Sequence, residues 1–259
     1  MTKTILVTGA TDGIGQLTAR KLVEQGHTVL LHGRSTAKLE ATAAQLGGTT
    51  ETYAADLSDL AQTAGLADAI RARHDALDVV INNAGVLRLS NPVTPSGLDA
   101  RFVVNTLAPY VLTRRLLPII PKTGRTVNLS SAAQAPVDIP AMMGKTRLDD
   151  MGAYAQSKLA ITIWTQELAA TLPTGPLVVA VNPGSLLASK MVKEGFGVAG
   201  NDLSIGADIL IEAALGDSFA DKSGAYFDND AGAFAAPHGA ASNPDHCRAV
   251  MQAIETLIS

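Results

Sequence analysis

The chain alternates short apolar runs, rich in β-branched residues, with longer segments whose apolar residues recur every three or four positions. Runs of the first kind predict buried strands, and segments of the second kind predict amphipathic helices. In the first half, strands are expected at 4–8, 28–32, 50–54 and 77–82, and helices at 13–25, 35–46 and 60–73. Continuous apolar strands joined through helices predict a parallel sheet covered on both faces, with right-handed crossovers.

The second half continues this alternation. Helices are expected at 96–117, through 154–158 to about 172, at 204–215 and at 244–258, and strands at 125–129, 177–181 and 225–228. Asn243-Pro244 supplies a cap and a proline at the first position of the last helix. Because no linker, repeat or low-complexity tract divides the chain, we expect an α/β fold in a single domain, 1–259, with a doubly wound parallel sheet of about seven strands.

Composition narrows the function classes. With 47% hydrophobic and 17% charged residues among 259, the chain is long enough to bury a sizeable core. A net charge of -4 and scattered basic residues give no reason to expect nucleic acid as a partner. Cys247 is the single cysteine, which excludes an internal disulfide and favours a reducing compartment. Apolar stretches are too short for a signal peptide or a membrane span, so we expect a soluble cytoplasmic protein.

A glycine-rich segment from Thr8 to Gly15 joins the first expected strand to the first expected helix. Glycines at such a turn let the backbone approach a phosphate, and the helix N-terminus presents free N–H groups to the anion. We interpret the segment as the dinucleotide loop of a Rossmann fold, in preference to an ordinary glycine-rich turn. Gly144-Lys145-Thr146 is similar to the end of a P-loop, but isoleucine at 139 stands where a P-loop needs glycine.

Tyr154 and Lys158 project from one face of the same expected helix, one turn apart. An ammonium beside a phenol favours the phenolate, so the pKa of Tyr154 is expected to fall below its free value of about 10. A tyrosine tuned in this way exchanges a proton with a substrate oxygen near neutral pH. The pair also occurs on many surface helices, so it indicates catalysis only together with other motifs.

Five motifs follow one another in an order that resembles the short-chain dehydrogenase/reductase family. They are Thr-Gly-x-x-x-Gly-x-Gly at 8–15, Asn82-Asn83-Ala84-Gly85, Ser130-Ser131, Tyr-x-x-x-Lys at 154–158, and Pro183-Gly184. The C-terminal part, including Gly224-Ala225-Tyr226-Phe227-Asp228, resembles the retinol-dehydrogenase-like branch. The resemblance implies an oxidoreductase that interconverts a carbonyl and an alcohol by hydride transfer with a nicotinamide cofactor.

The resemblance implies a catalytic set of four side chains. Tyr154 exchanges the proton on oxygen, and Ser131, rather than Ser130, hydrogen-bonds the substrate oxygen. Lys158 lowers the pKa of the tyrosine and binds the nicotinamide ribose. Asn105 falls where the family has an asparagine that interrupts a helix and holds the water of a proton relay; the alternative is a polar residue on a helix face.

The resemblance also implies the cofactor contacts. Asn83, Ala84 and Gly85 line the adenosine side. Asp56 accepts a hydrogen bond from the adenine amine, although it also fits a helix cap with Ser58. The other cofactor-binding residues implied are Gly9, Thr11, Asp12, Gly13, Ile14, Gly15, Arg34, Ser35, Leu57, Tyr154, Lys158, Pro183, Gly184 and Leu186.

NADP(H) is the preferred cofactor in this interpretation, and NAD(H) is the second choice. The second strand is followed by Gly33, where enzymes that prefer NAD usually carry an acid. An acid would repel the 2′-phosphate of NADP, whereas Arg34 can bind that phosphate bidentately and Ser35 can add a hydrogen bond. The alternative for Arg34 is a solvated loop residue.

Two segments, 132–153 and 185–240, are expected to bind the substrate. The first is longer than in the shortest family members and forms part of the substrate wall or blocks a neighbouring subunit. In the second, Ala188 stands where the family often has a carboxamide-binding threonine, with Ser185 or Ser189 as substitutes. Apolar residues in this segment favour a lipophilic carbonyl or alcohol as substrate: Leu186, Leu187, Met191 and Phe196.

Other functions fit less well. Potential metal ligands lack a ligand spacing; they are Asp228, Asp230, His238, His246 and Cys247. A serine hydrolase would need a Gly-x-Ser-x-Gly turn. An NADPH-binding redox sensor without turnover usually lacks the tyrosine or the lysine, and a nucleotide-sugar epimerase or dehydratase usually has a longer substrate domain.

The helix of Tyr154 has a second apolar face that bears Leu159, Ile163 and Ala170. A helix that is apolar all round is buried on both sides. In the family this helix often pairs with its copy, which favours a homodimer or homotetramer. A monomer is expected instead if the stretch 132–153 covers this face.

Overall fold

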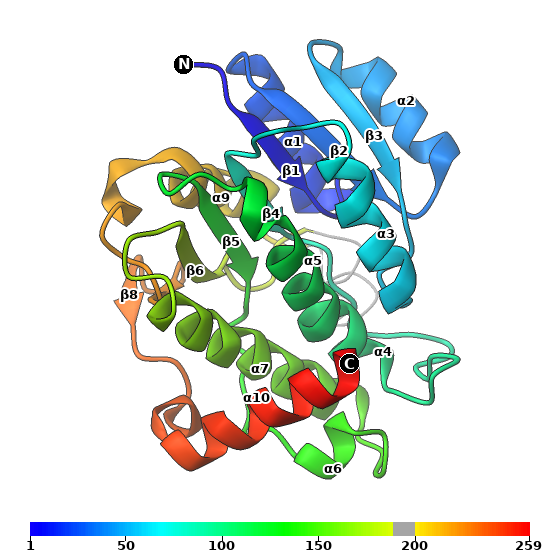
Figure 1. Cartoon of the computed structure of the whole chain (residues 1–259), viewed down its shortest axis with the longest axis vertical. Helices are drawn as coiled ribbons and strands as arrows, with labels where there is room; N and C mark the ends of the chain where they lie inside the picture. Colours follow the sequence, from blue (N-terminus) through cyan, green and yellow to red (C-terminus); the bar gives the residue numbers. More distant parts are fainter. Residues whose placement is uncertain (189–199) are drawn as a thin grey trace.

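The computed structural model describes residues 1–188 and 200–259. Within them lies a sheet of eight strands in the order β3-β2-β1-β4-β5-β6-β7-β8 (Figure 1). The strands are β1 (Thr4–Val7), β2 (Thr28–Gly33), β3 (Thr50–Ala54), β4 (Val79–Asn82), β5 (Arg125–Leu129), β6 (Leu177–Asn182), β7 (Tyr226–Asp228) and β8 (Ala233–Ala235). Neighbouring strands from β3 to β7 pair in parallel, and β8 pairs antiparallel with β7.

Helices cover both faces of the sheet. One face packs against α1 (Gly13–Glu24), α2 (Thr36–Leu46) and α9 (Leu203–Leu215). The other face packs against α3 (Leu60–Arg71), α5 (Ala108–Leu116) and α7 (Asp150–Ala170). Outside α7 lie α6 (Ile139–Met142) and α10 (Pro244–Ile258), as Figure 1 shows. The other short helices within the described residues are α4 (Ala100–Phe102), the π-helical turn Val103–Leu107 and three 3-10 turns, Leu117–Ile119, Asp217–Phe219 and Gly239–Ser242.

This arrangement confirms the expected single α/β domain with a doubly wound, largely parallel sheet. Along β1, Ile5 and Val7 are buried on the side of α1, whereas Leu6 is buried on the side of α3. Side chains alternate between the faces of a strand, so a continuous apolar run fills both layers at once. The cap of the last helix is also as expected, because Asn243 Oδ1 accepts hydrogen bonds from the backbone N–H groups of Asp245 and His246.

Two details differ from the sequence prediction. The helix expected from 96 begins at Ala100, because Gly97 has a left-handed φ of +82° and Asp99 caps the helix by accepting from Arg101 N. The sequence does not predict the strand β8. It has only three residues, Ala233–Ala235, and its neighbours are mostly glycine, alanine and aspartate, so no alternation of apolar and polar positions marks it. Its Phe234 packs edge-on against Phe227, with ring centroids 5.0 Å apart, which holds the short strand on β7.

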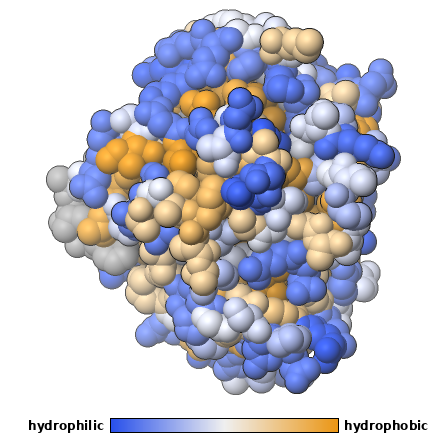
Figure 2. Space-filling view, turned by 90° about the vertical axis from the view of Figure 1, so that its left-hand side faces the viewer, coloured by the Kyte–Doolittle hydropathy of each residue, from blue (hydrophilic) through white to orange (hydrophobic). Residues whose placement is uncertain are grey.

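Most large apolar side chains of the described residues are buried in the core. Among the described residues, the exposed large ones are Met1, Met151, Leu186 and Ile205. Figure 2 shows one face of the molecule, on which polar side chains divide the apolar surface into several areas. No helix within 1–188 or 200–259 has both the length and the apolar character needed to cross a bilayer.

Candidate active site

The parallel strands from β1 to β6 lead at their carboxyl ends into one cavity of about 940 Å³. Such an edge is where open α/β sheets bind ligands. Most of the residues singled out in the sequence line this cavity: Gly9, Thr11, Asp12, Gly13, Ile14, Gly15, Arg34, Asp56, Leu57, Asn83, Ala84, Gly85, Ser131, Tyr154, Lys158, Pro183, Gly184 and Leu186. Asn105 and Ser35 are not among its lining residues.

The glycine loop is packed so closely at Gly15 that this position has no room for a side chain. A Cβ at Gly15 would lie 2.3 Å from both Asn83 Nδ2 and the carbonyl oxygen of Gly9. Asn83 Nδ2 in turn donates to the carbonyl of Thr8, at 2.8 Å, and to that of Gly9. The loop therefore brings bare backbone and the N-terminus of α1 to the cavity, which fits the phosphates of a dinucleotide.

His32 was not singled out in the sequence, yet it joins two parts of this cavity. It lies buried at the end of β2, where its Nδ1 accepts from Gly9 N at 3.3 Å and its Nε2–H donates to the carbonyl of Ala55 at 3.1 Å. Burial lowers the pKa of His32 to about 4, so the ring is neutral. In the sequence, His32 is a histidine at the carboxyl end of an apolar strand, and this pattern does not indicate which groups its ring contacts.

Asp56 and Asp59 both precede α3 and have different partners. Asp59 caps α3, because its Oδ1 accepts from the N–H groups of Ala61 and Gln62. Asp56 accepts from the backbone and hydroxyl of Ser58 in a local turn, at 2.9 and 2.8 Å, and lines the cavity. The helix-cap alternative therefore belongs to Asp59.

Arg34 and Ser35 follow β2 and differ in their surroundings. Arg34 is exposed and lines the cavity. Ser35 caps α2 by accepting from Lys38 N at 3.4 Å, so its hydroxyl is turned to its own helix.

Lys158 is buried in the wall of the cavity. Its Nζ donates to the carbonyl of Leu129 at 2.6 Å and lies 5.6 Å from the centre of the Tyr154 ring. Burial lowers the pKa of Lys158 to about 7. Gly85 faces the ammonium, because a Cβ there would lie 3.6 Å from Lys158 Nζ. At neutral pH the lysine is thus close to the midpoint between its charged and neutral forms.

Tyr154 has a pKa that is raised, whereas the sequence led us to expect a lowered one. Burial of the phenol is the main cause, and a hydrogen bond with Ser131 offsets part of it. Desolvation disfavours both charged forms of the pair, the phenolate of Tyr154 and the ammonium of Lys158. The phenol is therefore protonated at neutral pH.

The two serines after β5 have different environments. The hydroxyl of Ser130 is buried and contacts Thr162 Oγ1 at 2.7 Å and the carbonyl of Lys158 at 3.0 Å. Ser131 is only partly buried, lines the cavity and accepts from Ala133 N at 3.1 Å. Only Ser131 therefore has its hydroxyl beside the phenol of Tyr154.

Asn105 lies in a π-helical turn, Val103–Leu107, that interrupts the helix between α4 and α5. Its side chain is buried and is held by protein groups. Oδ1 accepts from Val86 N at 2.8 Å, and Nδ2 donates to the carbonyl of Val86 at 2.9 Å and to Ser157 Oγ at 3.0 Å. Asn105 thus ties the segment after β4 to α7, in the turn that precedes Lys158.

The segment after β6 is held by residues of the turn between β7 and β8. Asp230 accepts from the backbone N–H and the hydroxyl of Ser185, and both Asp228 and Asp230 accept from Asn182 Nδ2. The hydroxyl of Ser185 is therefore already used as a donor within the protein. The other serine considered for the carboxamide, Ser189, lies outside the described residues, as do Met191 and Phe196.

The stretch 132–153 contributes to the cavity only at its two ends, through Ala133 and Met151. Between them Val137, Ala141 and Met142 are buried in the core formed with α7 and α10. The middle of the stretch therefore packs into the core that α7 and α10 share.

The sequence of this chain is similar to those of known dehydrogenases. A family model of short chain dehydrogenases matches residues 3–196. Retinol dehydrogenase 13 of Homo sapiens is 33% identical over 253 residues, with 87% of this chain and 76% of that protein covered. Retinol dehydrogenase 12 of Bos taurus is 34% identical over 211 residues, with 75% of this chain and 64% of that protein covered.

Solved structures agree with these matches. An uncharacterized protein from Mycobacterium paratuberculosis has a TM-score of 0.82 and 29% identity, and the match covers 99% of this chain and 93% of that one. A metagenomic short-chain oxidoreductase in complex with NADP has a TM-score of 0.64 and 32% identity, with 81% and 89% covered. The chain therefore belongs to the short-chain dehydrogenase family, in its retinol-dehydrogenase-like branch, and is an oxidoreductase of alcohol and carbonyl groups with a nicotinamide cofactor.

Proposed function

We propose that this chain is an NADP(H)-dependent reductase of apolar carbonyl compounds, with Tyr154 as the proton donor. The observation that carries the proposal is the placement of Tyr154, Ser131 and Lys158 in the wall of the same cavity that the glycine loop lines. A raised pKa keeps the Tyr154 phenol protonated, which is the form that donates a proton to a carbonyl oxygen. In the reverse direction the same residue would have to be ionised first.

The cofactor, when bound, supplies the hydride, and the protein supplies position and charge. Ser131 donates a hydrogen bond to the substrate oxygen and keeps it beside the phenol. Tyr154 transfers its proton to that oxygen. Lys158, whose ammonium is poorly solvated, provides positive charge next to the phenol as it becomes a phenolate. Asn105 holds the segment after β4 against α7. The proton lost by Tyr154 is replaced through the proton relay whose water the family resemblance assigns to Asn105.

The preference for NADP(H) rests on Arg34 and Gly33. Arg34 is exposed beside the cavity, where its planar guanidinium can bind a 2′-phosphate bidentately. Gly33 contributes no carboxylate that would repel that phosphate. Binding of NADP by the metagenomic relative supports the same choice.

The substrate class rests on the apolar walls of the cavity. The apolar side chains that line it include Leu87, Leu89, Met151, Leu186 and Leu187. The name of retinol dehydrogenase 13 refers to a long, lipophilic alcohol, which supports a lipophilic partner here as well. We therefore propose an apolar aldehyde or ketone as the substrate to be reduced.

The test follows NADPH consumption by absorbance with a panel of aldehydes, ketones and quinones of increasing apolar length. Turnover with several lipophilic members, and slower turnover with NADH, is the expected result. NADPH binding in a calorimeter without turnover of any panel member would instead indicate a redox sensor. Turnover confined to short polar carbonyls would contradict the proposed substrate class.

A further inference from the structure

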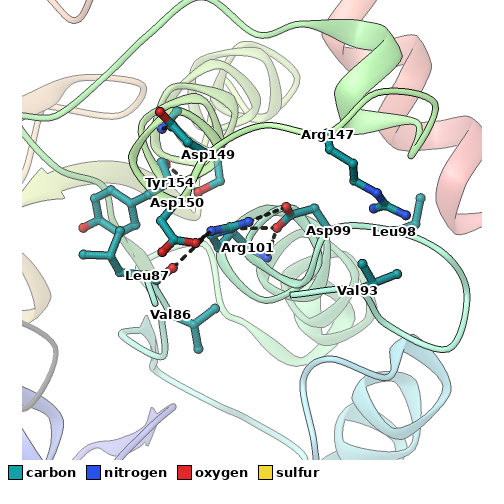
Figure 3. A network of polar contacts seen from close by, with 12 residues as sticks. Val86, Leu87, Val93, Leu98, Asp99, Arg101, Arg147, Asp149, Asp150 and Tyr154 are labelled. Carbon is teal, nitrogen blue, oxygen red and sulfur yellow. Dashed lines mark hydrogen bonds and ion pairs between the residues drawn. The ribbon is translucent and has the colours of Figure 1, made fainter. Parts of the chain in front are cut away.

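Arg101 lies at a junction of three segments (Figure 3), and each of them contributes a residue to the lining of the cavity. Its side chain is 1% exposed. Nε and Nη2 donate to the two carboxylate oxygens of Asp99 at 2.8 and 2.6 Å, and Nη1 donates to Asp150 and, at 3.4 Å, to the carbonyl of Leu87. The guanidinium therefore connects the start of α4, the first turn of α7 and the segment after β4.

One of the two carboxylates is sufficient to neutralise the buried charge. Asp99 is itself buried and binds the guanidinium through both oxygens, which is the strong geometry for this pair. Asp150 is different, because its side chain is 45% exposed and it comes from α7, 49 residues along the chain. Burial of Arg101 does not require this second bond, so its main effect is to attach α7.

The attached turn leads directly to the proton donor. Asp150 and Tyr154 are four residues apart on α7 and therefore lie on the same side of the helix, as Figure 3 shows. Leu87, whose carbonyl accepts from Arg101, lines the cavity, as does Met151, the neighbour of Asp150. A planar, fork-shaped donor fixes the distance between these segments better than a flexible ammonium would.

We propose that Arg101, through Asp150, is a positioning residue for proton transfer, because it fixes the first turn of α7 and hence the Tyr154 phenol relative to Ser131. The inference rests on the proposed function, since it assigns Arg101 to the step that Tyr154 performs. Loss of the bond should lower kcat and leave NADPH affinity nearly intact, because the glycine loop and Arg34 belong to other segments and Lys158 lies about two turns further along α7. A displacement of about 1 Å at a reacting group costs up to roughly 100-fold in rate.

The experiment changes Asp150, because Arg101 variants are at risk of not folding. Asp150→Ala removes the acceptor, and we expect kcat for the best panel carbonyl to fall about 10- to 100-fold. The NADPH dissociation constant, measured by calorimetry, should stay within twofold. Asp150→Asn keeps one acceptor oxygen and should restore part of kcat. Hydrogen exchange should become faster in the first turn of α7 in Asp150→Ala.

Asp149→Asn is the matched control. It removes one negative charge from the same end of α7, and asparagine preserves the cap that Asp149 provides through Gly152 N. The Asp149 variant should keep the parent kcat. Equal losses in both variants, or a kcat within twofold of the parent for Asp150→Ala, would overturn the proposal. If the parent reduces no carbonyl at all, the proposed function fails, and unchanged hydrogen exchange in Asp150→Ala would then refute the attachment of α7 separately.

Discussion

Thr11 fills the space beside Gly33: a Cβ at Gly33 would lie 2.9 Å from Thr11 Cγ2. The backbone of Gly33 needs no positive φ, so this contact is what keeps the position free of a side chain. We expect that Gly33→Asp alone will lower activity with NADPH without giving good activity with NADH. Combined with Thr11→Ala, which removes the contact, it should raise kcat/KM with NADH. A single variant that uses NADH as well as the double variant does would contradict this explanation.

Arg34 should distinguish the two cofactors. Loss of one charged hydrogen-bonded contact costs about 1.5–3 kcal/mol, or roughly one to two decades of affinity. Arg34→Ala should therefore weaken NADPH by that factor and leave NADH almost unchanged, as measured by calorimetric titration. Equal losses with both cofactors would mean that Arg34 holds the adenosine in general. A parent enzyme that prefers NADH would refute the proposed cofactor choice.

Tyr154→Phe tests the proton donor. The ring is retained and only the hydroxyl is removed, so NADPH binding should persist while kcat falls by about 10²–10⁴-fold. Steady-state rates and a calorimetric titration of the same preparation give both values. Turnover within tenfold of the parent would show that another group donates the proton.

Lys158 should make the folded protein less stable, especially at low pH. Its pKa is lowered to about 7 by burial, and an unfolded chain has a lysine pKa of about 10.4. Between these values the unfolded chain binds a proton that the folded chain does not, so the free energy of unfolding from this group rises with pH. We expect Lys158→Met to be inactive yet more stable below pH 7, by up to ~5 kcal/mol, in denaturant titrations at several pH values. Lys38→Met, at an exposed position, should change neither slope nor stability.

His32 should limit stability in acid. Its pKa is lowered to about 4, against about 6.5 in an unfolded chain, so between these values only the unfolded chain is protonated. The free energy of unfolding should therefore fall as pH drops through this window. His32→Leu loses two hydrogen bonds and should be less stable at pH 7, but its stability should depend less on pH. Parallel pH profiles of parent and variant would show that another group causes the acid sensitivity.

These placements indicate what a sequence can and cannot predict. Strands and helices followed from apolar periodicity. Ser131, Tyr154 and Lys158 lie in one cavity because Ser131 follows the predictable strand β5 and the other two share one face of the predictable helix α7. The direction of the Tyr154 pKa was wrong, because a spacing of four residues gives proximity but not desolvation. The Arg101–Asp150 bond was missed as well, since no local pattern relates residues 49 positions apart.

The outer face of α7 shows a similar limit. Leu159 and Ile163 are completely buried within one chain, in a core that also contains Val250 and Ile254 of α10, whereas Ala170 at the end of α7 is exposed. This burial favours the monomer over the homodimer or homotetramer, because α10 and the stretch 132–153 together cover the outer face of α7. We expect sedimentation at micromolar concentration to give a monomer; a dimer that persists on dilution would require a different interface.

The π-helical turn at Val103–Leu107 makes the site sensitive to chain length. A π turn contains one residue more than the α turn that it replaces, so deletion of a single residue there would produce a regular helix. The deletion would remove no catalytic group, yet it would rotate Asn105 away from Val86 and Ser157. Substitution scans keep the length constant and would not detect this dependence. A scan of single-residue deletions through 100–112 should therefore find one position where the folded state survives and turnover is lost.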